Sequence, residues 1–113
     1  MTIQMHLNTN PFDRIRAGKQ TVELRLNDEK RRKLCVGDEI RFLERGTDKN
    51  FSAIISALHV APCFVQLFER LSVTKAGYDS AWTPQQVSDW MRHYYSQEEE
   101  LCEGVVGIEV ELV

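Results

Sequence analysis

The sequence lacks long apolar runs and has few cysteines, and both features limit the kind of protein that it encodes. No stretch approaches the roughly 18 consecutive apolar residues of a membrane-spanning helix, so we expect no membrane span. The N-terminal residues do not place an apolar segment after a basic one, so we also expect no signal peptide.

The three cysteines, Cys35, Cys63 and Cys102, are odd in number and widely spaced. This pattern argues against a disulfide framework and favours a reducing compartment, so we expect a cytoplasmic protein. No cysteine or histidine pair has the spacing of a zinc site, and we therefore expect neither a metal nor a cofactor.

The net charge of −3 disfavours tight, non-specific binding to duplex nucleic acid, which depends on neutralising phosphates. The charge is unevenly distributed, however, because residues 19–45 hold eight basic and six acidic side chains. A local basic segment on an acidic protein suits a short single strand or a nucleotide. The acidic C-terminal segment, residues 98–111, leaves a protein–protein adaptor as a further hypothesis.

Apolar patterning predicts strands at residues 3–7, 19–26, 39–44, 51–60 and 108–113. Helices are predicted at residues 11–17, 62–71 and 84–94, with helical turns at 29–34 and 96–100. Residues 73–81 are predicted to be irregular. This order predicts one domain over residues 1–113, of the α+β class, with a small mixed β-barrel that the last strand closes and flanking helices.

The predicted strand at residues 19–26 alternates strictly between apolar and polar side chains. Its polar face carries Lys19, Thr21, Glu23 and Arg25, a row that combines an ammonium, a hydroxyl, a carboxylate and a guanidinium. If this face lines a groove, the row forms a binding site; the alternative is an ordinary solvated strand face.

Arg25 is the main candidate for ligand contact, since a guanidinium can grip a phosphate or stack on a base. Its alternative role is an ion pair with Glu23 or Asp28. Glu23 could accept a hydrogen bond from a cytosine amino group or hold Arg25 in place. Lys30, Arg31 and Arg32 are candidates for a phosphate-binding shelf, and an exposed charged turn is the alternative.

Two tryptophans are candidates for stacking on a base. Trp90 recurs at helical spacing with Val87, Met91 and Tyr94, which predicts a place in the core. Trp82 lies in the predicted irregular segment and is the better stacking candidate.

Several of these segments together resemble the activating-signal-cointegrator homology (ASCH) domain family. The likeness is carried by Pro11-Phe12, by residues 18–31 with their Gly-x-Lys-x-x-Glu-x-Arg-like core, by residues 36–40 and by residues 104–109. The resemblance implies a barrel like that of pseudouridine synthase and archaeosine transglycosylase (PUA-like), with a cleft beside the core motif. It also implies RNA or nucleotide binding.

Some small members of the family are amidohydrolases that remove acyl groups from N4-acylated cytidines, which is the alternative function that the resemblance implies. The family's catalytic lysine falls at Gln20 in this chain, and Lys19 stands one position earlier. The amidohydrolases carry a threonine where this chain has Glu23, and the segment that holds their catalytic glutamate offers Asp79. If the chain is such an enzyme, Lys19 and Glu23 are the candidate catalytic residues.

Overall fold

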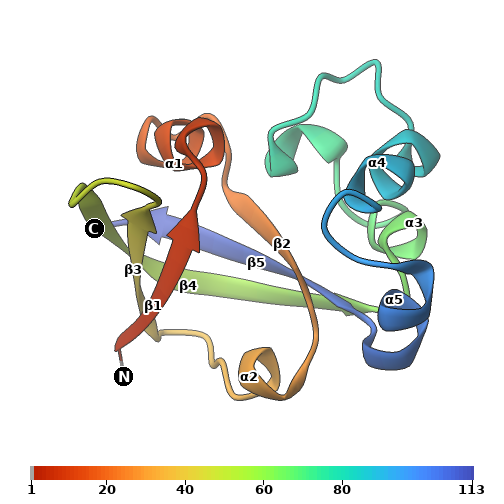
Figure 1. Cartoon of the computed structure of the whole chain (residues 1–113), viewed down its shortest axis with the longest axis horizontal. Helices are drawn as coiled ribbons and strands as arrows, with labels where there is room; N and C mark the ends of the chain where they lie inside the picture. The colour runs from red at the N-terminus through yellow and green to blue at the C-terminus, as the bar shows by residue number, and fades with distance from the viewer. Residues whose placement is uncertain (1) are drawn as a thin grey trace.

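The computed structural model describes residues 2–113, which form a curled five-stranded sheet with helices at its ends (Figure 1). In chain order the elements are β1 (Thr2–Leu7), α1 (Thr9–Arg16), β2 (Val22–Leu26), α2 (Glu29–Arg32), β3 (Glu39–Glu44), β4 (Asn50–Ala61), α3 (Phe64–Leu67), the 3₁₀ helix η1 (Val73–Ala76), α4 (Pro84–Met91), α5 (Gln97–Glu103) and β5 (Val105–Leu112). The α+β class is that predicted from the sequence.

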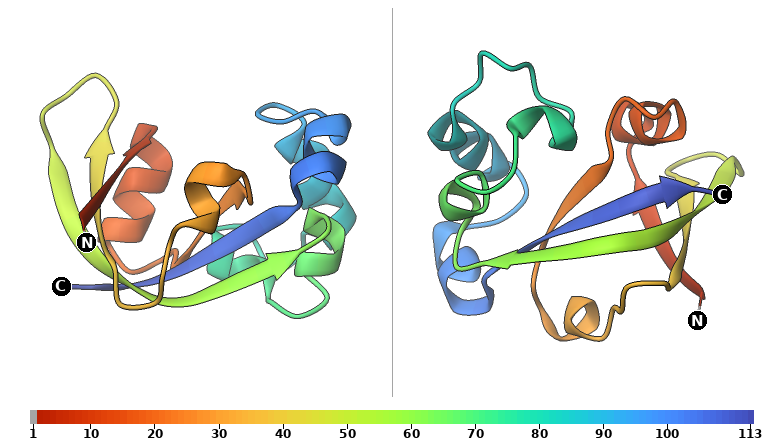
Figure 2. Two further views of the ribbon diagram at one scale, coloured as in Figure 1. Left: turned by 90° about the horizontal axis from the view of Figure 1, so that it is seen from below. Right: turned by 180° about the vertical axis from the view of Figure 1, so that it is seen from behind.

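The strand order β1-β3-β4-β5-β2 gives a half-barrel (Figure 2). Only the β1–β3 pair is parallel among the described strands; the other neighbours are antiparallel. We expected the last strand to close the barrel, but β5 lies inside the sheet, between β4 and β2. The edge strands β1 and β2 instead face each other across the open side, with α1 and α2 beside its two ends.

Two apolar cores hold the half-barrel together, and β4 contributes to both. One core fills the curl beneath α1, where Phe12 and Phe42 are fully buried. The other joins β2 and β5 to η1, α3 and α4 and includes the fully buried Phe64 and Val87. The 12-residue strand β4 places Ile55 in the first core and Ala61 in the second, with a register shift between them. The two cores therefore fix the helical end of the molecule relative to the open side of the sheet.

Local capping signals set two of the helix starts as the sequence predicts. The Thr83 side chain accepts a hydrogen bond from the backbone N–H of Gln86, and Gln86 Oε1 accepts one from the backbone N–H of Thr83; this capping box begins α4. Ser96 and Glu99 form the same reciprocal pair at the start of α5. Both helix starts lie beside the segment that forms one wall of the cavity described below.

Other boundaries differ from the sequence-based predictions. β2 begins at Val22, so Lys19 and Thr21 precede the strand. The helix predicted at 62–71 is regular only over Phe64–Leu67, and the one predicted to reach residue 94 ends at Met91. Within residues 2–113, no helix has both the length and the apolar character needed to cross a membrane.

Candidate functional site

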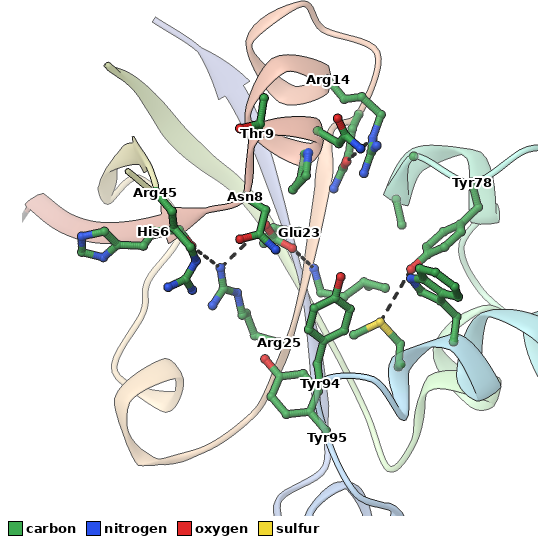
Figure 3. Close-up of a pocket in the computed structure, with 18 of the residues that line it drawn as sticks. His6, Asn8, Thr9, Arg14, Glu23, Arg25, Arg45, Tyr78, Tyr94 and Tyr95 are labelled. Atoms are coloured by element: carbon green, nitrogen blue, oxygen red, sulfur yellow. Dashed lines mark hydrogen bonds and ion pairs between the residues drawn. The ribbon is translucent and has the colours of Figure 1, made fainter. Parts of the chain in front are cut away.

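A cavity of about 530 Å³ opens where the two edge strands meet the helical end of the chain (Figure 3). One side is formed by the end of β1, the start of α1 and β2, and the other by residues 76–95. The lining combines charged, neutral polar, aliphatic and aromatic residues: His6, Asn8, Thr9, Asn10, Pro11, Arg14, Gln20, Glu23, Leu24, Arg25, Arg45, Ala76, Gly77, Tyr78, Trp82, Trp90, Met91, Tyr94 and Tyr95.

Glu23 on β2 is the acidic group of this cavity, and one of its oxygens is left without a hydrogen bond. Oε1 accepts from the backbone N–H of Leu24 at 3.0 Å, whereas Oε2 is buried and has no hydrogen-bond partner among the described residues. Burial raises the pKa of the Glu23 carboxyl, although Arg25 and the Leu24 N–H oppose that shift. A buried acceptor without a donor is costly, so a ligand N–H placed at Oε2 would be stabilising.

Arg25 lies two residues along the same face, where its guanidinium bridges the open side of the half-barrel. Its Nη2 donates to the backbone carbonyl of His6 on β1 at 3.1 Å and lies 3.8 Å from Glu23 Oε2. The Arg25 side chain is 15% exposed, so part of the guanidinium remains open to the cavity. The pairing with Glu23 that was considered for Arg25 is therefore present, and Arg25 is also one of the residues that line the cavity.

A second basic residue, Arg14 of α1, lines the cavity and is hydrogen-bonded to the buried side-chain amide of Gln20. Arg14 Nε donates to Gln20 Oε1 at 3.0 Å, and Gln20 Nε2 donates to the carbonyl of Val22 at 2.9 Å. Gln20 is only 4% exposed, so this pair connects α1 to the start of β2 with little freedom to move. The position where the resemblance places a lysine therefore holds a side chain that is committed to structural hydrogen bonds.

Gly77 packs against this pair and is expected to tolerate no side chain. Its φ is +90°, and a Cβ at Gly77 would lie 2.7 Å from Gln20 Oε1 and 2.8 Å from Arg14 Nε. We expect Gly77→Ala to lower the free energy of unfolding by about 2 kcal/mol, from backbone strain and displacement of the pair. Urea denaturation measures the loss.

Gly37→Ala is a matched control for this prediction, because Gly37 has a φ of +96° and no atom within 4 Å of the added Cβ. Gly37→Ala introduces the backbone strain without the collision. We expect this strain alone to lower the free energy of unfolding by about 1 kcal/mol or slightly more. Equal losses of unfolding free energy in the two variants would show that the collision has no cost, because the Arg14 and Gln20 side chains move aside.

Five aromatic side chains from residues 78–95 form the opposite wall. Tyr78 and Trp82 lie with ring centroids 5.2 Å apart, and Trp82 meets Trp90 at 6.3 Å. Tyr94 and Tyr95 follow α4 and face Glu23 and Arg25 across the cavity (Figure 3). Burial, with Tyr94 and Glu23 nearby, raises the pKa of Tyr78 to about 12, so its hydroxyl stays protonated and donates to Met91 Sδ at 3.6 Å. This wall offers flat apolar surfaces to a planar ligand.

The wall is held in place by a buried carboxylate on α5. Glu100 is 3% exposed, accepts from the backbone N–H of Phe64 at 2.9 Å and pairs with Arg92. Arg92 in turn donates to the carbonyl of Tyr95 at 3.0 Å, and the Tyr95 ring stacks on Phe64. Tyr95 is thus positioned by Arg92, which follows α4, and by Phe64 of α3, and both of these residues contact Glu100 of α5.

The structure brings together only some of the residues proposed from the sequence. Glu23, Arg25 and Trp82 line the cavity. Lys19 is exposed and, like Thr21, is not among the lining residues, because both precede β2. Lys30 and Arg31 lie on α2, also outside the lining, and Arg31 pairs with Asp28 at 3.2 Å.

One expectation is wrong and several cavity residues were not identified from the sequence. Trp90 was predicted to lie in the core, but it is 43% exposed and lines the cavity, whereas Val87 and Met91 of the same helix are buried. Arg14, Tyr78, Tyr94 and Tyr95 were not proposed as ligand contacts. The sequence contains one indication of this aromatic wall, since all three tyrosines and both tryptophans of the chain fall within residues 78–95.

Comparison with known proteins identifies the fold. The chain is similar to the crystal structure of hypothetical protein PH0355, with 29% identity, full coverage of both chains and a TM-score of 0.85. It is also similar to the solution structure of protein PF0455 from Pyrococcus furiosus, with 28% identity, coverage of 100% of this chain and 98% of that one, and a TM-score of 0.77.

A third similar structure is the ASCH protein of Zymomonas mobilis, in a single-residue mutant form, with 16% identity over 97% of this chain and 68% of that one and a TM-score of 0.70. No family model and no curated protein matches the sequence. The fold is therefore ASCH-like, that is, a PUA-like half-barrel with flanking helices. The Zymomonas mobilis likeness supports the sequence-based resemblance at the level of fold.

Proposed function

We propose that the cavity binds one nucleotide of a short single-stranded RNA, or the free nucleotide, with the base held between Glu23 and the aromatic wall. The observation that carries this proposal is the buried Oε2 of Glu23, which has no hydrogen-bond donor within the described chain and lies beside Arg25. An anion binder has no use for a buried carboxylate, and a purely apolar ligand leaves Oε2 unpaired. A nucleotide can pair with both Glu23 and Arg25, because its base carries N–H donors for the carboxylate and its phosphate is an anion for the guanidinium.

The base contact follows from what a carboxylate can accept. An ionised carboxylate accepts hydrogen bonds from the amino group of cytosine, whereas uracil presents a carbonyl oxygen at the same position. A base that reaches Glu23 lies across the cavity from Tyr94 and Tyr95, whose rings provide the stacking surface (Figure 3). The proposed site therefore favours cytosine over uracil.

The phosphate contact is assigned to the arginines that line the cavity. Arg14, Arg25 and Arg45 approach it from α1, from β2 and from the residue after β3. Lys30 and Arg31 on the neighbouring α2 are proposed to meet the next phosphate of a strand, which keeps them in the binding surface although they lie outside the cavity.

Titration with short oligocytidylate, oligouridylate and a duplex of equal length tests this function, with quenching of tryptophan fluorescence as the readout. We expect saturable binding of the single strands, weaker binding of the duplex, and about tenfold preference for cytosine over uracil from one good base contact. Equal affinities for oligocytidylate and oligouridylate would overturn the proposed role of Glu23. A lack of any binding would overturn the function itself.

A second candidate function is hydrolysis of the acyl group of an N4-acylated cytidine. The observation in its favour is that burial raises the pKa of the Glu23 carboxyl inside the cavity, which is a property of groups that transfer protons in enzymes. Gln20 at the family's lysine position and the exposed Lys19 favour binding over catalysis. Release of cytidine from N4-acetylcytidine, lost in Glu23→Gln and kept in Lys19→Ala, would support hydrolysis through Glu23.

A further inference from the structure

A second, smaller cavity of about 320 Å³ opens on the outer side of α4, where it is bounded by aromatic and acidic side chains. Its lining residues are Trp82, Gln86, Asp89, Trp90 and His93. Two of them, Trp82 and Trp90, also line the larger cavity beside Glu23 and Arg25, which is called the nucleotide cavity below, so the two cavities share these indole side chains.

The aromatic rings of this cavity form a corner. Trp82 and Trp90 stand at 89° to each other with centroids 6.3 Å apart, and His93 lies against Trp90 with a centroid distance of 4.3 Å. Perpendicular aromatic walls let one bound group contact two ring systems at once. Indole rings attract cations electrostatically through the negative potential of their faces, and tryptophan does so more strongly than tyrosine or phenylalanine.

Charge distinguishes this cavity from the larger one. The nucleotide cavity is lined by three arginines, whereas the smaller one is lined by the carboxylate of Asp89 and, among the described residues, by no lysine or arginine. Asp89 Oδ1 accepts from Gln85 Nε2 at 3.0 Å, which fixes the carboxylate without neutralising it. A phosphate is disfavoured beside this carboxylate, and a second nucleotide is therefore a poor occupant despite the aromatic walls.

We propose that the Trp82–Trp90–Asp89 corner binds a quaternary or polymethylated ammonium group. Such a cation presents methyl groups that pack against both indoles, while its charge is attracted by the rings and by Asp89. It needs no hydrogen-bond partners, which suits walls that are mostly aromatic carbon. This site shares two indole side chains with the nucleotide cavity, but its occupation by a cation does not depend on the function proposed for that cavity.

Choline and its neutral isostere 3,3-dimethyl-1-butanol test the proposal, with tryptophan fluorescence and the indole N–H signals in NMR spectra as readouts. We expect choline to bind saturably and at least about threefold more tightly than the neutral alcohol, the difference being the cation–aromatic and carboxylate attraction. Equal binding of the two compounds, or no saturable response to choline, would overturn the proposal.

Two variants locate the response. Asp89→Asn is expected to weaken choline binding roughly two- to fivefold and to leave the affinity for short RNA unchanged or slightly higher. Glu98→Gln is the control, since it removes the same charge from an exposed position on α5 outside the cavity lining, and it should retain choline binding. If the single variants Asp89→Asn and Trp90→Leu both keep full choline affinity, choline does not bind at this corner and the proposal is wrong.

A peptide with trimethyllysine, compared with its unmodified lysine form, distinguishes the source of the cation. Tighter binding of the methylated peptide than of choline identifies a protein-borne group as the occupant, and binding of choline alone identifies a small free cation. Either result supports the site, whereas equal binding of the methylated and unmodified peptides, without a response to choline, counts against it.

Discussion

Replacing Arg25 with alanine is expected to weaken binding of short single-stranded RNA by about 10- to 100-fold, because a hydrogen-bonded charge contact is removed from the centre of the cavity. The slope of log affinity against log salt concentration should fall in magnitude by about 0.7, the value for one phosphate contact on a single strand. The experiment is a set of titrations at several salt concentrations, with oligocytidylate as the probe.

Arg41→Ala is the matched control for Arg25→Ala. Arg41 lies on β3, bonds to Asn50 and is not a lining residue, yet its loss changes the net charge by the same amount. If the two variants weaken RNA binding equally, the interaction is general electrostatic attraction and the cavity is not its site.

Arg25→Lys separates binding from folding, because Arg25 also joins β2 to β1 through the carbonyl of His6. Lysine keeps the charge but loses the planar fork of donors. We expect it to preserve the salt slope while affinity still falls. Thermal denaturation of all three variants then shows whether any loss of binding follows from loss of structure.

The elements of the fold were largely predictable because their signals are local. Alternation identifies β2 from Val22 onwards, and the two capping boxes mark the starts of α4 and α5 from residues three positions apart. Strand order was not predictable in this way. Whether β5 closes a barrel or lies within the sheet depends on pairing between distant segments, and periodicity carries no information about that.

The cavity was only half predictable for the same reason. Glu23 and Arg25 share a strand face, so parity alone places them together. Extending that parity to Lys19 fails, because Lys19 lies in a turn after Gly18, whose φ is +77°, and its backbone N–H bonds to the carbonyl of Arg14. Strand parity has no meaning before the strand begins.

The aromatic wall depends on contacts that no short window of sequence reveals. Tyr95 is positioned by Arg92 and by Phe64, 31 residues earlier, and both are held by Glu100. Trp90 has the helical spacing of a core residue, but only Val87 and Met91 of that stripe are buried, and the Trp90 ring packs against Trp82 and His93 at the surface. This wall of the cavity is thus set by tertiary packing rather than by local sequence pattern.

Glu23→Gln is expected to reverse the base preference of the cavity. The amide oxygen can accept from the Leu24 N–H as Oε1 does now, which turns the amide NH₂ toward the position of the present Oε2. That position changes from an acceptor to a donor, so the uracil carbonyl becomes the better partner than the cytosine amino group. Each base contact of this kind discriminates by about 1–3 kcal/mol, so the ratio of affinities should change by at least about tenfold.

The same substitution is expected to stabilise the protein. Because burial raises the pKa of Glu23 in the folded state, keeping the carboxylate ionised at neutral pH costs folding free energy. This group favours folding below its ordinary pKa of 4.5, and that contribution is lost as pH rises through the raised value. Glu23→Gln should therefore raise the free energy of unfolding at neutral pH, and the gain should disappear under acidic conditions.

Glu111→Gln provides the control, since it removes the same charge from an exposed position on β5. Urea denaturation at several pH values and titrations with oligocytidylate and oligouridylate complete the measurement. A carboxylate kept at a cost in stability is expected where its charge is needed for binding. If Glu23→Gln is destabilised at neutral pH and retains its preference for cytosine, Glu23 is a structural partner of Arg25, and the base is recognised elsewhere.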